Sequence, residues 1–362
     1  MSKLVYAGFD PTADGLHLGS LAILSHLRKS AKQGNLTYAV IGAATGSIGD
    51  PTGKNQARSV IEPEQLEINM KALERDILAV CPDITVIRND WFPDFLTFQQ
   101  KVMRHIPLSK LLGLSLVADR LGTTGISLME ALYPVMQAYD FCVLAGLMEA
   151  ENLNREHDAL TGIIQVGGQD QVGNMSMGLH LLNRLMPHIQ GDFHAIPLLT
   201  NARGEKMGKS AGNALWLSSQ KMPDVEFYDA LLSLPDECVE AIGLFLDKDA
   251  FDSARTVHFP SMKRNFMQEI VKMVRGEEAL KRILATKEGA TQNLPPFKME
   301  GLDLKGVLVG SGLCRSKGEV LRMIGNQCIR VNGIKVSSVQ EQKAAIKVGD
   351  VVSCGKRQIV LV

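Results

Sequence analysis

The sequence predicts an α/β protein whose N-terminal domain contains a parallel sheet covered by helices on both faces. Residues 4–9 (LVYAGF) and 38–42 (YAVIG) are short apolar segments, each followed by a turn and then a helical pattern. Continuously apolar strands that alternate with helices are typical of parallel sheets buried on both faces. Ligands of such Rossmann-like sheets bind beyond the carboxyl ends of the strands, where both turns would lie.

The pattern changes twice along the chain, which predicts further domains after residues 1–216. From residue 217 to 285 apolar residues recur at helical spacing, so we expect an α-helical domain. Residues 286–302 contain two glycines and two adjacent prolines, which is typical of a linker. Residues 303–362 predict a small α+β domain, with two short helices and then a hairpin around Asn332-Gly333.

The composition predicts a globular cytoplasmic protein. The 362 residues are enough for two or three domains, and a hydrophobic content of 45% is ordinary. No apolar run approaches the ~18 residues of a membrane span, and the N-terminus lacks the apolar core of a signal peptide. Six scattered cysteines without a CxxC pair argue against a disulfide framework or a zinc ribbon.

The formal net charge of zero conceals an asymmetry. Residues 303–362 carry ten Lys/Arg against four Asp/Glu, which leaves 29 against 35 for the rest of the chain. A small basic domain on a mildly acidic body suggests contact with phosphate backbones. An ordinary lysine-rich surface is the alternative interpretation of the charge taken alone.

Two motifs predict a site for a nucleotide polyphosphate. In residues 10–20 (DPTADGLHLGS) a histidine opens an apolar helix, which puts a donor at a helix N-terminus, where phosphates bind. In residues 204–210 (GEKMGKS) Lys206 and Lys209 lie three apart on a glycine-flanked loop. Such lysines can bring mobile positive charge around a polyphosphate. Each motif is weak alone, and the evidence comes from their pairing in one α/β domain.

Three further segments fit the same site. Residues 42–54 (GAATGSIGDPTGK) form a glycine-rich loop that could contact a phosphate. Tyr133, Gln137 and Asp140 are spaced at i, i+4 and i+7, so they share one helical face. The alternative is a core aromatic residue with two solvated neighbours. Residues 165–174 (QVGGQDQVGN) end an apolar strand in paired glycines and a carboxylate, which suits ribose hydroxyls.

Together these stretches are similar to tyrosyl-tRNA synthetases of the bacterial type. The matching sequences, in the family's order, are YAGFDPTADGLHLGS, IGAATGSIGDPTGK, YPVMQAYDF, QVGGQDQVGN and GEKMGKS. The first and last resemble the two signature motifs of class I aminoacyl-tRNA synthetases. The resemblance covers nearly the whole chain, because the C-terminal 60 residues resemble the RNA-binding module of these enzymes.

The resemblance implies an enzyme that activates L-tyrosine with ATP and transfers it to tRNA(Tyr). Mg²⁺ would accompany the phosphates without a protein metal site. The enzyme would be a homodimer whose catalytic domain contains a dimer-forming insertion, with tRNA spanning both subunits. The helical domain would lie on the anticodon side.

The resemblance also implies roles for the matching residues. L-tyrosine would be bound at its hydroxyl by Tyr6 and Asp140, at its α-ammonium group by Tyr133, Gln137 and Asp50, and at its carboxylate by Gln171. The ATP-binding residues would be Asp10, Gly19, Ser20, Gly168, Asp170, Leu198, Leu199 and Ser210, with Gly168 and Asp170 at the ribose. The catalytic residues at the leaving phosphates would be Thr12, His17, Lys206 and Lys209.

The sequence departs from the family pattern at several points. Ser20 stands where a histidine or asparagine is usual, so we expect weaker ribose contact. Gln169 and Val172 replace a serine and a tryptophan. The 24 residues between Asp140 and Gln165 exceed the usual number, and 149–160 is polar enough for an extra loop. The helical segment that precedes the first strand in the family is missing, so its contacts are expected to be absent or replaced.

Two alternatives stay open. A tryptophan-activating relative would share the nucleotide motifs, but not Tyr6 with Asp140 or the C-terminal module. A non-catalytic RNA-binding protein with the same fold is the second alternative. The presence of His17, Lys206 and Lys209 argues against it, since RNA binding alone would not require them.

Overall fold

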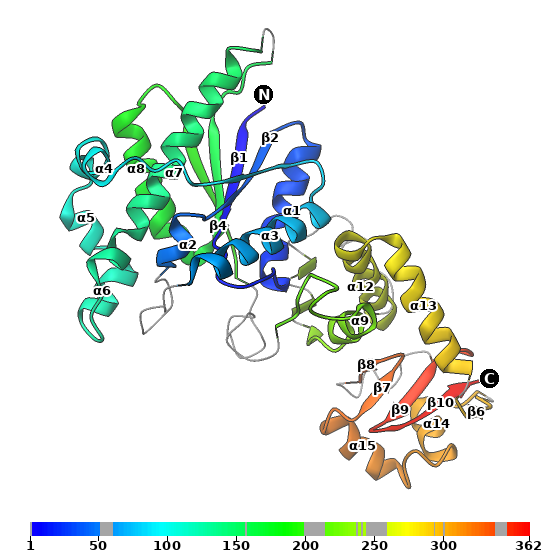
Figure 1. Cartoon of the computed structure of the whole chain (residues 1–362). Coiled ribbons are helices and arrows are strands. Elements are labelled where there is room, and N and C mark those ends of the chain that lie inside the picture. The colour runs from blue at the N-terminus through cyan, green and yellow to red at the C-terminus, as the bar shows by residue number, and fades with distance from the viewer. Residues whose placement is uncertain are drawn as a thin grey trace. The chain divides into compact units, whose positions relative to one another are not determined.

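The computed structural model describes residues 2–50, 61–155, 158–198, 214–236, 238–239, 242–243, 259–292, 294–299, 301–336 and 346–362. The chain divides into two compact units, Met1–Lys221 and Met222–Val362 (Figure 1).

The first unit is built on a five-stranded parallel sheet with the order β3-β2-β1-β4-β5. The strands are β1 (Leu4–Phe9), β2 (Leu36–Ile41), β3 (Thr85–Arg88), β4 (Ile163–Gly168) and β5 (Gly191–Ile196). The predicted parallel sheet is confirmed, and β2 begins two residues before the predicted segment. The strand order reverses beside β1, and open α/β sheets bind ligands at the carboxyl ends next to such a reversal.

Helices cover both faces of this sheet, as predicted. Helices α1 (Leu18–Lys32) and α3 (Pro63–Val80) lie on one face, and α7 (Leu128–Asn152) and α8 (Val172–Leu185) on the other (Figure 1). Leu4 and Tyr6 share a core with Phe141 of α7 and Leu181 of α8. Val5, which points to the opposite face, is also buried. Burial on both sides explains why β1 reads as a continuous apolar run.

A group of short helices is inserted between β3 and α7. They are α4 (Phe95–Lys101), the 3₁₀ turn η1 (Met103–His105), α5 (Leu108–Leu112) and α6 (Ser115–Leu121). These helices and the start of α7 expose large apolar side chains, namely Phe95, Leu96, Leu108, Leu112, Leu121, Leu128 and Met129. Leu108 is 67% exposed and Leu128 is 73% exposed. An apolar surface of this kind is typical of protein contact sites.

Helix α7 is the long helix that carries the predicted polar face. A capping box begins it, because Ser127 and Glu130 bond to each other's backbone N–H groups. Within the described parts of the chain, α7 alone is long and apolar enough to cross a membrane, and 61% of that stretch is buried inside the protein. Residues 149–152, expected in a loop, extend this helix. Two hydrogen bonds between Asn152 and Leu160, of 3.0 and 2.7 Å, close the loop that follows.

The second unit combines helices with a small sheet of the order β6-β10-β9-β7-β8. The helices are α9 (Asp224–Leu232), α12 (Phe259–Arg275), α13 (Glu277–Gln292), α14 (Leu304–Gly310) and α15 (Lys317–Gly325). The strands are β6 (Pro296–Phe297), β7 (Ile329–Val331), β8 (Ile334–Lys335), β9 (Val351–Cys354) and β10 (Arg357–Leu361). The expected hairpin joins β7 to β8, and Asn332 (φ 51°) and Gly333 (φ 82°) both adopt the left-handed conformation that a tight hairpin turn requires.

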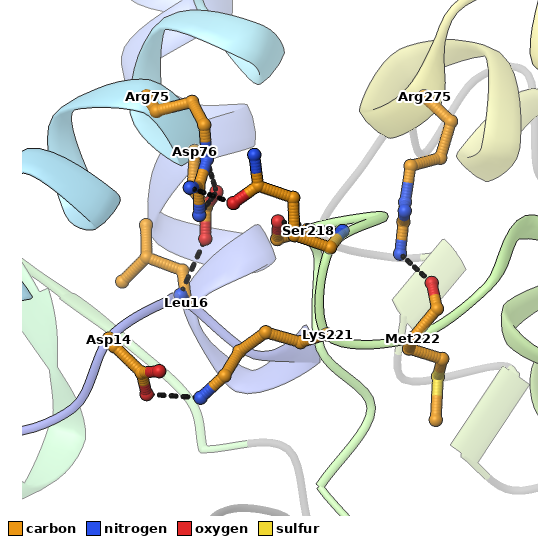
Figure 2. Close-up of polar contacts among 9 residues, drawn as sticks. Asp14, Leu16, Arg75, Asp76, Ser218, Lys221, Met222 and Arg275 are labelled. Atoms are coloured by element: carbon orange, nitrogen blue, oxygen red, sulfur yellow. Dashed lines mark hydrogen bonds and ion pairs between the residues drawn. The ribbon is translucent and has the colours of Figure 1, made fainter.

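Two expected boundaries differ in the structure. Residues 286–302 are not a free linker: α13 continues to Gln292, and β6 pairs with β10. The first unit ends after Lys221 and not after residue 216. Lys221 forms an ion pair with Asp14 inside the first unit, whereas the Met222 carbonyl accepts a hydrogen bond from Arg275 Nη2 at 3.1 Å inside the second (Figure 2).

Candidate active site

The loop after β1 leads to His17, which caps the N-terminus of α1. The backbone of His17 is extended (φ −118°, ψ 171°), and its Nδ1 accepts a hydrogen bond from the Gly19 N–H at 3.1 Å. A ring nitrogen that accepts carries no proton, so the proton of the neutral imidazole lies on Nε2. The donor predicted at this helix N-terminus is therefore His17 Nε2–H. Ser20 lies in the first turn of α1, where its N–H donates to the His17 carbonyl at 2.8 Å.

The backbone around His17 pairs with the segment that follows the lysine motif. His17 forms an antiparallel bridge with Trp216. Two hydrogen bonds, each 2.8 Å, flank the bridge and link Leu18 N to Leu215 O and Leu217 N to Leu16 O. Residues 215–217, which follow the lysine motif in the sequence, therefore lie beside the histidine motif. The predicted site residues Leu199, Lys206, Lys209 and Ser210 lie outside the described residues.

Asp140, on the predicted polar face of α7, is a buried carboxylate held by two donors. Its Oδ2 accepts from Asn89 Nδ2 and its Oδ1 from Trp91 Nε1, each at 3.0 Å. It is only 6% exposed, and burial raises its pKa to about 7 despite both hydrogen bonds. Asp140 is thus neither solvated nor unpaired, which excludes the alternative in which it was a surface residue.

The Tyr6 hydroxyl lies in the same buried region and has no hydrogen-bond partner in the described structure. Its ring packs edge-on against Phe141 of α7, with 5.7 Å between centroids. Burial raises the Tyr6 pKa well above its usual value, and the nearby Asp140 carboxylate raises it further. A buried hydroxyl without a partner is costly, so this end of the site suits a ligand that brings a hydroxyl of its own.

Asp10 organises the next part of the site at the carboxyl end of β1. Its Oδ2 accepts from the Tyr133 hydroxyl at 2.6 Å, and its Oδ1 accepts from Thr45 Oγ1 at 2.9 Å. Thr45 begins the short helix α2 (Thr45–Ile48) and also accepts from Asn89 Nδ2 at 3.1 Å. Asn89, which donates to both Thr45 and Asp140, therefore connects the hydrogen bonds around Asp10 with Asp140. Burial, followed by the Asp10 charge, raises the pKa of Tyr133 well above its usual value, so its hydroxyl is a donor.

A network of side-chain amides joins three elements at the centre of the site. Gln171 Nε2 donates to Asp50 Oδ2 at 2.5 Å. Asn174 Nδ2 donates to Gln137 Oε1 at 3.0 Å and to Gln171 Oε1 at 3.1 Å. Asn174, at 1% exposure, thereby orients both glutamine side chains. Side chains from the glycine-rich turn, from residues 165–174 and from α7 therefore meet in one hydrogen-bond network.

Gly168, at the end of β4, lies against Asp170, which belongs to the 3₁₀ turn η2 (Gln169–Gln171). A Cβ atom on Gly168 would come within 2.4 Å of Asp170 Oδ1 and 3.1 Å of Leu198 Cδ2. A side chain at position 168 would therefore require the Asp170 carboxylate to move. Gly168, Asp170 and Leu198 thus meet at the carboxyl ends of β4 and β5.

Sequence reasoning missed Asn89, Trp91 and Asn174 as individual site residues. Asn89 and Trp91 directly follow β3, so their place after a strand of the sheet was the available signal. Asn174 closes the motif of residues 165–174, but its two glutamine partners could not be read from spacing. Among the described residues, no group of three or more His, Cys, Asp or Glu side chains could hold a metal ion.

Comparison with known proteins identifies the family. The model of the family described as "tRNA synthetases class I (W and Y)" matches residues 2–288. The tyrosine–tRNA ligase of Protochlamydia amoebophila is 30% identical over 375 residues, covering 92% of this chain and 84% of the relative. The tyrosine–tRNA ligase of Streptococcus gordonii is 31% identical over 370 residues, covering 92% and 85%.

The fold also resembles solved structures. A C-terminally truncated mitochondrial tyrosyl-tRNA synthetase of Aspergillus nidulans superposes with a TM-score of 0.63 at 19% identity, covering 80% of this chain and 86% of that one. This likeness concerns the fold alone, whereas the family model covers most of the chain. The chain therefore belongs to the class I tRNA synthetases for tryptophan and tyrosine.

Proposed function

We infer that this chain is a tyrosine–tRNA ligase, which forms tyrosyl-adenylate from L-tyrosine and ATP and then transfers tyrosine to tRNA(Tyr). The observation that carries this inference is the buried Tyr6 hydroxyl, which has no partner in the described structure and lies near the buried Asp140 carboxylate. Curated relatives at 30–31% identity are tyrosine–tRNA ligases, which supports tyrosine over tryptophan within the family.

The proposed pocket end binds the phenolic hydroxyl through both of its hydrogen-bonding functions. The phenol would donate to Asp140 and accept from the Tyr6 hydroxyl, which has no partner in the described structure. Burial raises the pKa of Asp140 to about 7. The phenol would be a third donor to this carboxylate, after Asn89 and Trp91, and would favour its ionised form. An indole N–H can only donate, so tryptophan would leave the Tyr6 hydroxyl buried and unpaired.

The polar network at the centre would bind the amino-acid end of the substrate. Asp50 and Gln137 would bind the α-ammonium group together with Tyr133. Gln171, which Asn174 orients, would contact the carboxylate. Gly168, Asp170 and the backbone near Leu198 would hold the nucleoside of ATP. Asp10, Gly19 and Ser20 would contact ATP from the carboxyl end of β1 and from α1. Leu199 and Ser210, which would also bind ATP, lie outside the described residues.

The chemistry needs positioning more than proton transfer. Class I tRNA synthetases use ATP, and the tyrosine carboxylate attacks the α-phosphorus in line while pyrophosphate leaves. Catalysis then consists of holding the reactants together and stabilising the charge that grows on the phosphates. His17 Nε2–H and Thr12 would donate to these phosphates, joined by Lys206 and Lys209. Mg²⁺ would enter as part of the ATP substrate, since it binds phosphates and usually keeps several waters.

The remaining parts of the chain suit tRNA and a second subunit. Residues 303–362, with their excess of positive charge, would bind tRNA phosphates, and the helices from α9 to α13 would lie on the anticodon side. The exposed apolar side chains from Phe95 to Met129 would form the contact of a homodimer. Analytical ultracentrifugation of the wild type and of Leu128→Asp tests this contact, and a monomeric wild type would refute it. As a translation enzyme the protein would act in the cytoplasm.

ATP–pyrophosphate exchange with each amino acid tests the function. Exchange that depends on tyrosine, with little or none with tryptophan, is the expected result. Exchange with tryptophan alone would assign the chain to the other branch of the family. No exchange with either, together with tRNA binding, would identify a non-catalytic RNA-binding relative.

A further inference from the structure

A buried carboxylate on α3 contacts the histidine motif from outside the proposed pocket. Asp76 Oδ2 accepts a hydrogen bond from the backbone N–H of Leu16 at 2.9 Å (Figure 2). Leu16 precedes His17, and the two partners are 60 residues apart in the sequence. Asp76 is 3% exposed, although nothing in the proposed reaction uses it directly. A carboxylate buried this deeply must be paired to be tolerated.

Arg75 supplies that pairing and extends it. Its Nε and Nη2 atoms donate to Asp76 Oδ1 at 3.1 and 2.9 Å, and its Nη1 donates to Gln220 Oε1 at 2.6 Å. Both N–H groups converge on Oδ1, so Oδ2 is the oxygen that accepts from the Leu16 N–H. The guanidinium group therefore joins Asp76 to the segment that follows the lysine motif.

That segment holds the histidine motif from the other side. Residues 215–217 form the β hydrogen bonds around His17, and Lys221 forms an ion pair with Asp14 (Figure 2). The Lys221 ammonium group also lies 4.0 Å from the centre of the Trp216 ring, a cation–π distance. The loop of residues 14–18 is thus enclosed between α3 and the segment 215–221.

Gly15 shows how close this packing is. A Cβ atom there would lie 3.1 Å from Asp76 Oδ2, 3.3 Å from Lys221 Cδ and 3.6 Å from Trp216 Cε3. A side chain at position 15 would push the carboxylate away from the Leu16 N–H, or push the Lys221 segment outward. The glycine therefore permits the contact between Asp76 and the loop.

We propose that Asp76 is a positioning residue for adenylate formation. Together with Arg75 it fixes the backbone of Leu16, and therefore the position of the His17 donor, relative to residues 215–221. This proposal rests on the function proposed above. It requires that loss of Asp76 slow the chemical step without weakening tyrosine binding, because Asp76 holds the loop assigned to the phosphates.

The test compares Asp76→Ala with Asp76→Asn and Glu74→Ala. The last is a matched control that removes a half-exposed carboxylate from the same helix. We expect Asp76→Ala to lower the single-turnover rate constant of tyrosyl-adenylate formation by about 10- to 100-fold, the cost of misplacing a reacting group by about an ångström. The tyrosine Kd, measured by equilibrium dialysis, should stay unchanged. Asp76→Asn should be clearly faster than Asp76→Ala, because its amide oxygen can still accept from Leu16.

Arg75→Met provides a second variant in case circular dichroism shows that Asp76→Ala is unfolded. The Arg75 side chain is 40% exposed, so its replacement disturbs the core less. Arg75→Met should also lower the rate constant of tyrosyl-adenylate formation, by less than Asp76→Ala, and leave the tyrosine Kd unchanged. A wild-type rate in folded Asp76→Ala, or a loss of tyrosine affinity as large as the loss of rate, would overturn the proposal. If Asp76→Ala is unfolded, a wild-type rate in Arg75→Met would do the same. A wild-type protein that forms no tyrosyl-adenylate would instead refute the proposed function.

Discussion

The indole Nε1 of Trp91 donates a hydrogen bond to Asp140 Oδ1 at 3.0 Å, across a gap of 49 residues in the sequence. Asn89 holds the other carboxylate oxygen, so both oxygens face donors. This arrangement stabilises the ionised form of Asp140 against the burial that raises its pKa. In the proposed site, recognition of a substrate hydroxyl by Asp140 would therefore depend on two residues that the motifs do not include.

Replacing Trp91 with phenylalanine should weaken tyrosine recognition while keeping most of the ring volume. A hydrogen bond to a charged group contributes about 1.5–3 kcal/mol, so kcat/KM for tyrosine should fall by roughly 10- to 100-fold. Phe92→Leu is the control, because it removes a neighbouring ring that packs on Phe98 and Tyr139 and removes no donor to Asp140. Equal losses in the two variants would mean that Trp91 acts through packing alone.

Discrimination against phenylalanine should depend on Tyr6 and Asp140. Phenylalanine would leave the buried Tyr6 hydroxyl without a partner, at about 1–3 kcal/mol, and would also fail to supply the donor that the phenol of tyrosine offers to the charged Asp140. Tyr6→Phe should cost tyrosine only about 1 kcal/mol in kcat/KM, since it removes a neutral partner. Asp140→Ala should lower kcat/KM for tyrosine far more. It should also reduce the preference for tyrosine over phenylalanine, because the pocket end becomes apolar. Adenylation kinetics with both amino acids measure this, and an unchanged ratio in Asp140→Ala would remove Asp140 from recognition.

The pH dependence of tyrosine use should follow Asp140. Its pKa in the folded protein, about 7, is raised from 3.8, so ionisation of Asp140 destabilises the free enzyme. Its contribution to stability is therefore complete below about pH 4 and is lost as the pH rises through 7. Because the phenol donates best to the ionised form, kcat/KM for tyrosine should rise through an apparent pKa near 7, as a profile of the free enzyme reports. A flat profile between about pH 6 and pH 8 would contradict this assignment.

Lys209→Ala should lower the rate of tyrosyl-adenylate formation by about 10²–10³, the effect of removing one donor to the transition state. Tyrosine affinity should barely change, because a lysine directed at pyrophosphate does not touch the amino acid in the ground state. Stopped-flow adenylation and equilibrium binding separate the two effects. Near-normal adenylation in this variant would refute the role of Lys209.

Truncation after Gln292 should preserve adenylate formation and abolish most tRNA charging. The cut falls there because β6 pairs with β10, so removal of residues 303–362 alone would leave a strand without its partner. Loss of the basic sheet and helices should also flatten the dependence of tRNA binding on salt, because fewer phosphates are neutralised. Charging at the full rate by the truncated enzyme would place the function of the C-terminal region elsewhere.

The features that could be predicted from the sequence depend on residues that are close together along the chain. The apolar run of residues 4–9 predicted a buried parallel strand, and Asn332-Gly333 predicted a tight hairpin. The spacing of Tyr133, Gln137 and Asp140 predicted one face of a helix. Each of these follows from backbone geometry, turn chemistry or helical period, which act over a few residues.

Contacts between residues that are distant in the sequence could be found only in the folded protein. Four hydrogen bonds of this kind join partners that are 37 to 60 residues apart. They link Asn89 and Trp91 to Asp140, Asn174 to Gln137, and Asp76 to Leu16. The strand order brings the ends of β1, β3 and β4 to one edge of the sheet, and side-chain packing then selects the partner of each buried polar group. Buried polar groups find their partners in three dimensions, so no spacing along the chain encodes these pairs.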